Sequence, residues 1–446
     1  MKWERMMKRA IGRLVFALGA LGLTTSAASP PESDLRVGAS RIDITPPLNE
    51  LAEPFTSVAD RVYLRAVAIE SRGKRAVMVI ADVPTISAPV AADMIARISA
   101  EAKVPREHIV LGTTHTHNVM RVDPNTKGII LPGSAKFVEQ VTAAAVKAVG
   151  QAVSALQPAR VGTGKGWAHL VGNRNVWSTK HGRYIADVDR TGSEPIDHKL
   201  GVVKFETLDG KPIAYLLNYA FEPIIAMAIK SEISGDVPGA ASRIIEERSG
   251  AVALFTIGAA GVPFYRAEDT PPAKRRDHAL ELIHTYGSVL AEEALATAAE
   301  MQTSGEGLTI SGGARPLICP GKATTPFNLP DRCAYSVDSK LPACDFKDRD
   351  ADPVTLNIGV IQIGDLAIVQ SDANVTPALG AKLQRMTPMA NTWIVARTFG
   401  PLRFVVDDAA YAHNTYEATA TTAKKGCAEA GYLRHSLEMI SAHPGR

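Results

Sequence analysis

The chain has 446 residues, of which 46% are hydrophobic and 21% charged, so its composition is that of a folded globular protein and excludes disordered and fibrous classes. The formal net charge of +3 divides into +4 in residues 1–28 and about −1 in the rest. A nearly neutral body offers no basic face to neutralise phosphates, which argues against a nucleic-acid-binding protein.

The N-terminal segment has the three-part layout of a secretory signal. Basic residues 1–13 precede an apolar run at 14–23, and the small residues Ser26-Ala27-Ala28 follow. A run of this length is shorter than the roughly 18 apolar residues that span a membrane. We therefore expect residues 1–28 to be a signal peptide, and the mature protein to be exported, either to the periplasm or out of the cell.

Strand and helix patterns alternate after this segment. A strand at 36–44 ends at prolines, and two β-branched runs at 62–70 and 76–82 predict a hairpin. The apolar spacing at 88–102 predicts a helix. Further strands are expected at 108–112, 200–206, 213–219, 251–257, 356–363, 366–370 and 392–396, and further helices at 135–153, 239–247, 279–301, 377–386 and 431–440.

This alternation, with hairpins among the strands, indicates an α/β fold in which a mixed sheet is layered with helices. No repeat or flexible linker divides the chain. We therefore expect residues 29–446 to form one catalytic-type domain that carries an inserted loop at 315–353.

The four cysteines fit an oxidising compartment. Cys319, Cys333 and Cys344 lie in the Pro-rich segment at 315–353, and Cys427 follows later. An even set of cysteines in an exported protein usually forms disulfides, and the spacing here matches no C-x2-C zinc pattern. We expect two disulfides, and the three possible pairings stay open.

The most specific local pattern is TTHTHN at residues 113–118, directly after the strand expected at 108–112. Side chains two positions apart on an extended backbone project to the same side, so His115 and His117 can present both imidazoles to one point. Paired histidines of this kind hold zinc, and sites in α/β folds gather at strand ends. A pair of structural histidines, held by hydrogen bonds at a strand end, explains the same pattern. Other segments of the chain must therefore decide between a zinc site and this structural role.

Five short segments occur in a fixed order along the chain: VGASRIDITPP at 37–47, the TTHTH segment, Gly172-Asn173-Arg174, Asn218-Tyr219-Ala220 and Ser234-Gly235-Asp236. Together they resemble the neutral/alkaline non-lysosomal ceramidase family, and the resemblance extends from about residue 36 to about residue 440. It implies a ceramidase-like α/β catalytic domain, export, and a zinc-dependent amidase that cuts the N-acyl bond of ceramide.

The resemblance also implies roles for single residues. His115 matches a zinc ligand of the family, and His117 matches a histidine that holds the substrate. Arg174 matches a substrate-contacting arginine, and Tyr416, in a Tyr-Glu pair, matches a tyrosine of the site. We therefore expect His117, Arg174 and Tyr416 to be catalytic. Glu222 stands where the family has its second zinc histidine, and a carboxylate oxygen binds zinc at about the same distance as an imidazole nitrogen.

Three positions depart from the family pattern. Its glutamate ligand corresponds to Asn374, its metal-associated tyrosine to Phe404, and its polar catalytic residue to Phe264. A phenylalanine at the last position leaves water as the nucleophile, with no covalent step. Asp372, two residues before Asn374, offers a replacement carboxylate. The expected zinc ligands are His115, Glu222 and Asp372.

Two further acids have structural explanations. Asp236 stands before the Val-Pro-Gly start of a predicted helix, where a short acid accepts hydrogen bonds from the first-turn N–H groups. We interpret it as a helix cap, with a role in the site as the alternative. Asp82 either faces the site or merely ends its strand.

Three functions are compatible with these residues. The first, which we expect, is an exported zinc-dependent hydrolase that cleaves an amide bond of a ceramide-like N-acyl lipid. The second is a hydrolase of another amide or ester, and the third is a non-catalytic binding descendant that has lost the metal site. His115, His117 and Arg174 favour an enzyme, whereas Phe264 and Phe404 favour loss or change. The expected partner is a lipid or small-molecule substrate, with no nucleic acid and no transmembrane segment.

Overall fold

The computed structural model describes residues 33–124, 134–180, 182–265, 270–323, 349–396, 400 and 402–442. The expected signal peptide at 1–28, as well as Cys333 and Cys344, lies outside these residues. Ser33–Arg446 forms one compact unit. Among the helices described, none is long and apolar enough to cross a membrane.

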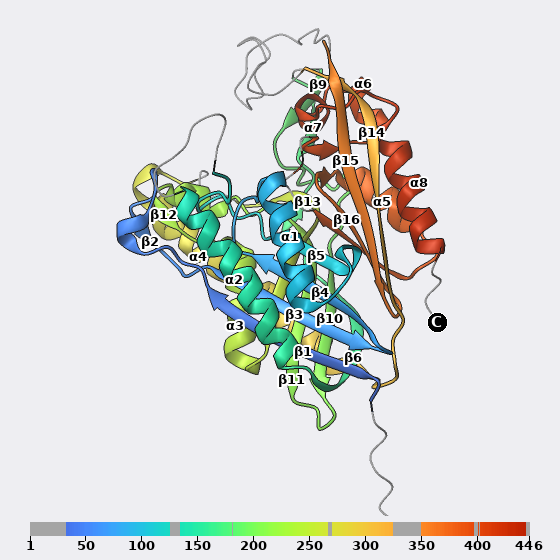
Figure 1. Cartoon of the computed structure of the whole chain (residues 1–446). Helices are drawn as coiled ribbons and strands as arrows, with labels where there is room; N and C mark the ends of the chain where they lie inside the picture. The colour runs from blue at the N-terminus through green and yellow to red at the C-terminus, as the bar shows by residue number, and fades with distance from the viewer. Residues whose placement is uncertain are drawn as a thin grey trace, which may run out of the picture. The chain divides into compact units, whose positions relative to one another are not determined.

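The larger sheet is mixed, as the sequence predicts (Figure 1). Its strands within the described residues are β1 (Leu35–Asp43), β3 (Tyr63–Ser71), β4 (Lys74–Ala81), β5 (Ile109–Thr113), β6 (Gln157–Trp167), β7 (Val171–Gly172), β10 (Lys199–Thr207), β11 (Pro212–Phe221) and β13 (Val252–Pro263). They lie in the order β5-β4-β3-β1-β6-β10-β11-β13-β7. The β4–β5 and β11–β13 pairs are parallel, and the other pairs are antiparallel.

A second sheet packs against one face of the first. Its strands, in the order β14-β15-β16-β18, are β14 (Ile310–Lys322), β15 (Asp350–Ile363), β16 (Leu366–Ser371) and β18 (Asn391–Ala396). Alternation along β3 shows how the first sheet serves two cores. Leu64, Ala66 and Ala68 belong to the core beneath the helices, whereas Val67 and Ile69 belong to the core shared with the second sheet.

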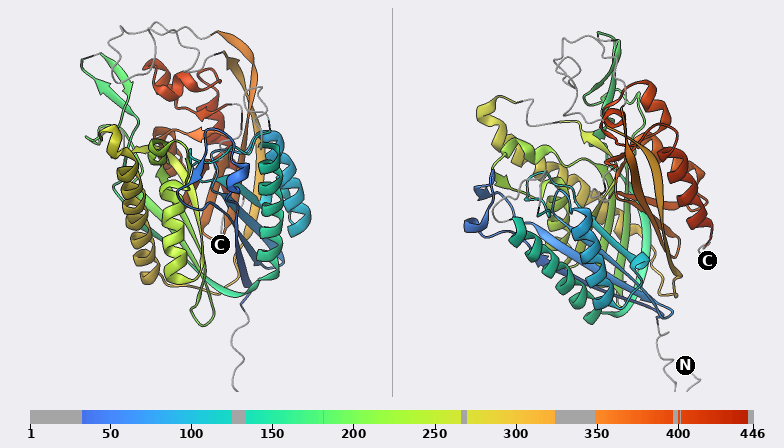
Figure 2. Two further views of the ribbon diagram at one scale, coloured as in Figure 1. Left: turned by 90° about the vertical axis from the view of Figure 1, so that its left-hand side faces the viewer. Right: turned by 45° about the horizontal axis from the view of Figure 1, so that its top comes forward.

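Helices cover the outer faces of both sheets, which gives four layers (Figures 1 and 2). On the first sheet lie α1 (Ala88–Ala102), α2 (Ser134–Ser154), α3 (Asp236–Ser249) and α4 (Arg275–Glu300). On the second lie α5 (Pro377–Met386) and α8 (Ala428–Ser441). Each helix therefore buries one apolar face against a sheet, as expected for an α/β layer fold.

Shorter elements fill the loops around the ends of these strands. They are β2 (Ser57–Val58), β8 (Asn175–Ser178), β9 (Arg183–Ala186), β12 (Glu232–Ile233), β17 (Asn374–Val375), β19 (Phe404–Val405), α6 (Asp408–Ala412), α7 (Tyr416–Ala420), and the 3-10 turns η1 (Leu48–Glu50), η2 (Arg106–His108), η3 (Ile225–Ile229) and η5 (Pro272–Lys274).

The expected strands and helices are confirmed with shifts of a few residues at their ends, and the long strands β6 and β14 are additional, as are the short strands. β6 is rich in glycine, a residue that weakens strands. At Gly162 the end of α4 passes so close that an added Cβ would lie 2.9 Å from the Gln302 carbonyl oxygen. The close approach of the helix, which the sequence pattern does not show, explains this composition.

The expected loop at 315–353 is wrong at both of its ends. Residues 315–322 belong to β14 and residues 350–353 to β15, and the two strands pair along their length as one long hairpin. A disulfide joins Cys319 to Cys427 and so attaches β14 to the residue that precedes α8. The pairing of Cys319 and Cys427 was one of those left open.

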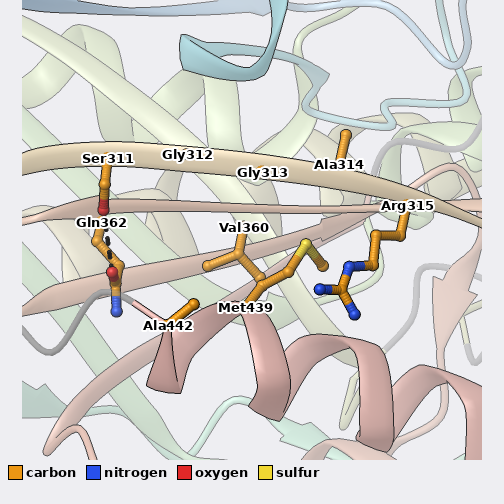
Figure 3. A pocket seen from close by; sticks show the side chains of 9 residues that line it. All are labelled: Ser311, Gly312, Gly313, Ala314, Arg315, Val360, Gln362, Met439 and Ala442. Atoms are coloured by element: carbon orange, nitrogen blue, oxygen red, sulfur yellow. Dashed lines mark hydrogen bonds between the residues drawn. The ribbon is translucent and has the colours of Figure 1, made fainter.

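A cavity of about 150 Å³ lies between β14 and α8, beside the glycines at 312 and 313 (Figure 3). The polar groups of its wall are already paired. Ser311 donates to the Gln362 side-chain oxygen at 3.0 Å, and Gln362 donates to the Ile440 carbonyl at 2.9 Å. We interpret the cavity as a packing gap beside Gly313, where an added Cβ would meet only the Met439 side chain, at 3.3 Å.

The main sheet and α3 are joined by a buried ion-pair network. Arg65 on β3 is 2% exposed and pairs with Asp82 at 2.8 Å and with Glu246 of α3 at 2.7 Å. Burial lowers the pKa of Arg65, but the charges of the two acids outweigh it and leave the pKa raised. Asp82 therefore has the structural role of an ion-pair partner at the end of β4.

We expect Arg65→Met to lower the free energy of unfolding by about 3–5 kcal/mol, because it leaves two buried carboxylates without their shared cation. Arg41→Met is the matched control, since Arg41 also pairs with Glu246 but its side chain is 39% exposed. Its cost should stay below about 1 kcal/mol. Urea unfolding measures both, and equal losses would contradict the expectation.

Asp236 begins α3 as a buried acid. Its carboxylate accepts hydrogen bonds from the backbone N–H groups of Val237 at 2.6 Å and Ala226 at 2.8 Å. Burial and the neighbouring charge of Asp60, which itself pairs with Arg243, raise the pKa of Asp236 from 3.8 to about 7, against the lowering effect of these hydrogen bonds. The cap interpretation is therefore not confirmed: Gly235 is the N-cap of α3 and no side chain caps it, whereas Asp236 is the first residue of the helix and bonds to the next N–H and to the η3 turn.

The raised pKa predicts a pH-dependent stability. Between about pH 4 and pH 7 the folded chain holds a proton on Asp236 that the unfolded chain has lost. Relative to Asp236→Asn, the free energy of unfolding should therefore fall by up to about 1.4 kcal/mol per pH unit as the pH rises through this window. Urea unfolding of both proteins across the window tests this, and a constant difference would refute it.

Candidate active site

The loop after β5 presents His115 in a fixed orientation. Its backbone has a φ of 57°, a left-handed conformation that turns the chain sharply at the end of the strand. The ring Nδ1 lies 2.6 Å from the Pro84 carbonyl oxygen, which can only accept a hydrogen bond. Nδ1 must therefore carry the proton when the ring is neutral, and Nε2 presents a lone pair.

His117 faces the same point, but not through strand alternation, because β5 ends at Thr113 and the chain turns at His115. The two imidazole rings are 4.9 Å apart in an edge-to-face arrangement. Thr116 between them is fully buried, and it donates a hydrogen bond to the Ser234 carbonyl at 2.7 Å. The His117 side chain is 34% exposed, against 17% for His115, so the His117 flank of the site is open to solvent.

Glu222 completes the group from the loop after β11. Its backbone N–H bonds to the Gly261 carbonyl at the end of β13, and its side chain is 10% exposed. One oxygen, Oε1, lies 3.5 Å from Nε2 of His115 and 3.5 Å from Nε2 of His117. Within the described residues, His115, His117 and Glu222 have ligand atoms that all lie within 4.8 Å of one another.

The second oxygen of Glu222, Oε2, forms an ion pair with Arg174. The guanidinium lies 3.5 Å from Oε2, and its other side is 3.8 Å from Glu417 and 5.0 Å from the centre of the Tyr416 ring. Asn175 donates a hydrogen bond to Glu417 at 2.9 Å and so fixes that acid. Arg174 is thereby held between two carboxylates and an aromatic face.

The electrostatics keep Glu222 ionised. Burial raises the pKa of Glu222, but Arg174 and the two histidines outweigh it and leave the pKa well below the ordinary value. Burial likewise lowers the pKa of His115, and the nearby carboxylate of Glu222 reverses this to a raised pKa. The group therefore offers one carboxylate and two imidazoles, a donor set suited to a divalent cation.

The spacing of these donors fits zinc. A tetrahedral site with bonds of about 2.0–2.1 Å places its ligand atoms about 3.3–3.4 Å apart. The two distances of 3.5 Å from Oε1 to the imidazole nitrogens match such edges. They are long for a hydrogen bond to an ion, which is usually about 2.7–2.9 Å. Two histidines and one glutamate are also the protein ligands of one type of catalytic zinc site.

Asp372 does not join this group. Its two carboxylate oxygens accept hydrogen bonds from the backbone and side-chain amides of Asn357, at 2.9 and 2.7 Å. The expected ligand set of His115, Glu222 and Asp372 is therefore not the set that the structure brings together. His117, expected to hold the substrate, supplies the third donor atom of the group.

The three positions that depart from the family pattern lie in two separate places. Asn374 and Phe404 are directly paired in the β17–β19 ladder, and the Phe404 ring lies 5.9 Å from the Tyr416 ring. Phe264 lies apart from them, at the end of β13. Its ring packs against Gly172, and its centre is 6.5 Å from that of His198.

Sequence reasoning did not identify two of the supporting groups. Glu417 escaped attention, although the Tyr-Glu pair that identified Tyr416 contains it. The Pro84 carbonyl is a backbone group with no sequence signal. The HxH spacing predicted that both imidazoles face one point, which the structure shows, but the sequence analysis assigned His117 to the substrate and not to the metal.

Fold and site together define an α/β protein with two histidines and a carboxylate gathered at strand ends. The sequence profile described as neutral/alkaline non-lysosomal ceramidase, N-terminal, matches residues 36–261, which is half of the chain. The chain therefore belongs to the neutral/alkaline non-lysosomal ceramidase family, a family of amidohydrolases.

Two solved structures have the same fold. A ceramidase complexed with C2 is 20% identical, with a TM-score of 0.73, over 92% of this chain and 75% of that one. The neutral ceramidase from Pseudomonas aeruginosa is 21% identical, with a TM-score of 0.72, over 92% of this chain and 74% of that one.

The geometry makes a direct prediction about metal content. His117→Ala should lower bound zinc from about one per chain to well below that, because it removes a donor atom from the group. Asp372→Asn is the matched control and should retain zinc, since Asp372 serves Asn357. Elemental analysis of both purified variants decides between the two ligand sets: loss of zinc only in Asp372→Asn would restore the one that sequence reasoning favoured.

Proposed function

We propose that this protein is an exported, zinc-dependent hydrolase that cleaves the amide bond of a ceramide-like N-acyl lipid, with His115, His117 and Glu222 as zinc ligands. One observation supports this most directly: the Glu222 oxygen lies at tetrahedral-edge distance from both imidazole nitrogens. Membership of the ceramidase family supports the reaction class and the substrate class. A disulfide between Cys319 and Cys427 is consistent with export.

Zinc in this group would act as a Lewis acid and make water nucleophilic at neutral pH. The residues of the chain provide orientation. The Pro84 carbonyl holds the proton on Nδ1 of His115, which keeps Nε2 available as a ligand. Arg174 holds Oε2 of Glu222 and leaves Oε1 to face the histidines. The carboxylate is thus suited to bind through one oxygen.

Tyr416 is suited to contact the substrate. Burial raises the pKa of its hydroxyl, and the charges of Glu222 and Glu417 add to this against the lowering effect of Arg174. The hydroxyl therefore keeps its proton at neutral pH and can donate a hydrogen bond to the amide carbonyl. Phe264 offers no nucleophile, so water attacks the amide directly, and the products are a carboxylate and an amine.

The test is hydrolysis of a short-chain N-acylsphingosine by the zinc-loaded mature chain, measured as release of the sphingoid base. His115→Ala should lower the rate by about 100-fold or more, because the metal is lost. His413→Ala is the matched control: this histidine is exposed and contacts Tyr184 outside the ligand group, so its rate should change less than about twofold.

An ester of the same acyl chain, assayed in parallel, separates the alternatives. Hydrolysis of the ester without release of sphingoid base would contradict the proposed substrate and favour the second function. Zinc-loaded protein that hydrolyses neither compound would contradict the enzyme and favour a binding protein.

A further inference from the structure

The Ser234-Gly235-Asp236 segment, which the proposed mechanism does not use, lies between the two loops that carry the ligands. We propose that this segment sets the distance between the histidine pair and Glu222, and that Asp236 is its positioning residue. The inference rests on the proposed function, because it concerns the same three ligands.

On the histidine side, two hydrogen bonds join the segment to the loop at 115–118, and a third joins that loop to Glu232, two residues before the segment. Thr116 donates its hydroxyl to the Ser234 carbonyl at 2.7 Å, and the Ser234 N–H donates to the Asn118 carbonyl at 2.9 Å. Asn118 also donates its side-chain amide to the Glu232 carbonyl at 3.2 Å. Thr116 is the residue between the two histidines, so its bond fixes the backbone from which both rings project.

On the glutamate side, the contact is the Asp236 carboxylate. Its Oδ2 accepts the N–H of Ala226 in the η3 turn, which begins three residues after Glu222. The intervening Pro223 and Ile224 are short and constrained, since proline fixes its own φ. Displacement of the turn at Ala226 therefore moves the backbone of Glu222.

The segment itself is anchored from outside. Asp60 accepts hydrogen bonds from the Ser234 hydroxyl at 2.5 Å and the Gly235 N–H at 3.0 Å, and Arg243 neutralises Asp60 at 2.8 Å. Asp236 has a φ of 53°, a costly conformation for a residue with a side chain. The surrounding hydrogen bonds hold Asp236 in that conformation, as expected for a residue whose position is set by contacts with two loops.

Zinc affinity depends steeply on how well ligands are placed, and loss of a supporting hydrogen bond costs about 10- to 100-fold. We therefore expect Asp236→Asn, which loses one strong acceptor but keeps the shape, to raise the zinc dissociation constant about tenfold. Thr116→Val, which removes the hydroxyl at the other end, should have an effect of the same size. Competition with a chromophoric chelator measures both.

Because both bonds act through one segment, the double variant should weaken zinc binding by less than the product of the two single effects. The d–d absorption of the cobalt-substituted protein reports the ligand geometry and should change in each variant. Asp407→Asn is the matched control: Asp407 is a buried acid at the start of α6 that accepts a backbone N–H, and it contacts neither ligand loop. It should lower the melting temperature and leave zinc affinity unchanged.

If the unsubstituted chain binds no zinc, both this inference and the proposed function are wrong. If it binds zinc and Thr116→Val or Asp236→Asn binds it equally well, the inference alone is wrong. Should Asp236→Asn fail to fold, Thr116→Val decides by itself, since it breaks the same connection at its other end. Equal weakening in Asp407→Asn would show a general effect of stability and would also overturn the inference.

Discussion

The site depends on the charge of Glu222. A carboxylate at this depth is costly unless cations and hydrogen bonds surround it. Here Arg174 pairs with one oxygen, and His115 and His117 face the other. Every other feature of the site follows from that arrangement: Glu417 is needed to hold Arg174, and the Pro84 carbonyl is needed to turn His115 toward the acid.

The exchange of a histidine for Glu222 therefore changes more than one ligand. A neutral imidazole needs no counter-ion, whereas a carboxylate takes part of the hydrogen-bonding capacity of Arg174. In this chain the guanidinium is shared between Glu222 and Glu417 before any substrate arrives. Arg174 thus belongs to the ligand group as much as to the substrate pocket, which separates this site from the pattern that its motifs suggest.

Much of this structure is readable from the sequence, and the exceptions have physical reasons. Alternation and helical spacing located most strands of both sheets, but not β6, β7 or β14, and six long helices, because burial of one face imposes those periods. β6 was missed because its glycines make room for the neighbouring helix α4, and glycine is not typical of strands. At the site, too, local motifs drew attention to His115, His117 and Glu222, but they did not show which of these residues lie together in space.

Asp372 shows where local reasoning ends. Sequence proximity to Asn374 suggested that its carboxylate could replace the missing ligand, but direction and distance across a loop are set by tertiary contacts. Asn357, on the neighbouring strand β15, takes both of its oxygens. Instead, the loop at 115–118 supplied the third donor from a residue already two positions from the first. His115 and His117 lie two residues apart on one loop, so their side chains must be close in space. Asp372 lies two residues from Asn374, but this does not bring its side chain to the place of the missing ligand.

The uneven exposure of the two histidines bears on how the site is filled. His115 and Glu222 lie deep, but the His117 flank opens to solvent in the folded chain. If the group binds zinc as proposed, the ion would reach it from that side while every strand stays paired with its neighbour. Its binding free energy would then add to the stability of a fold whose four layers are already complete.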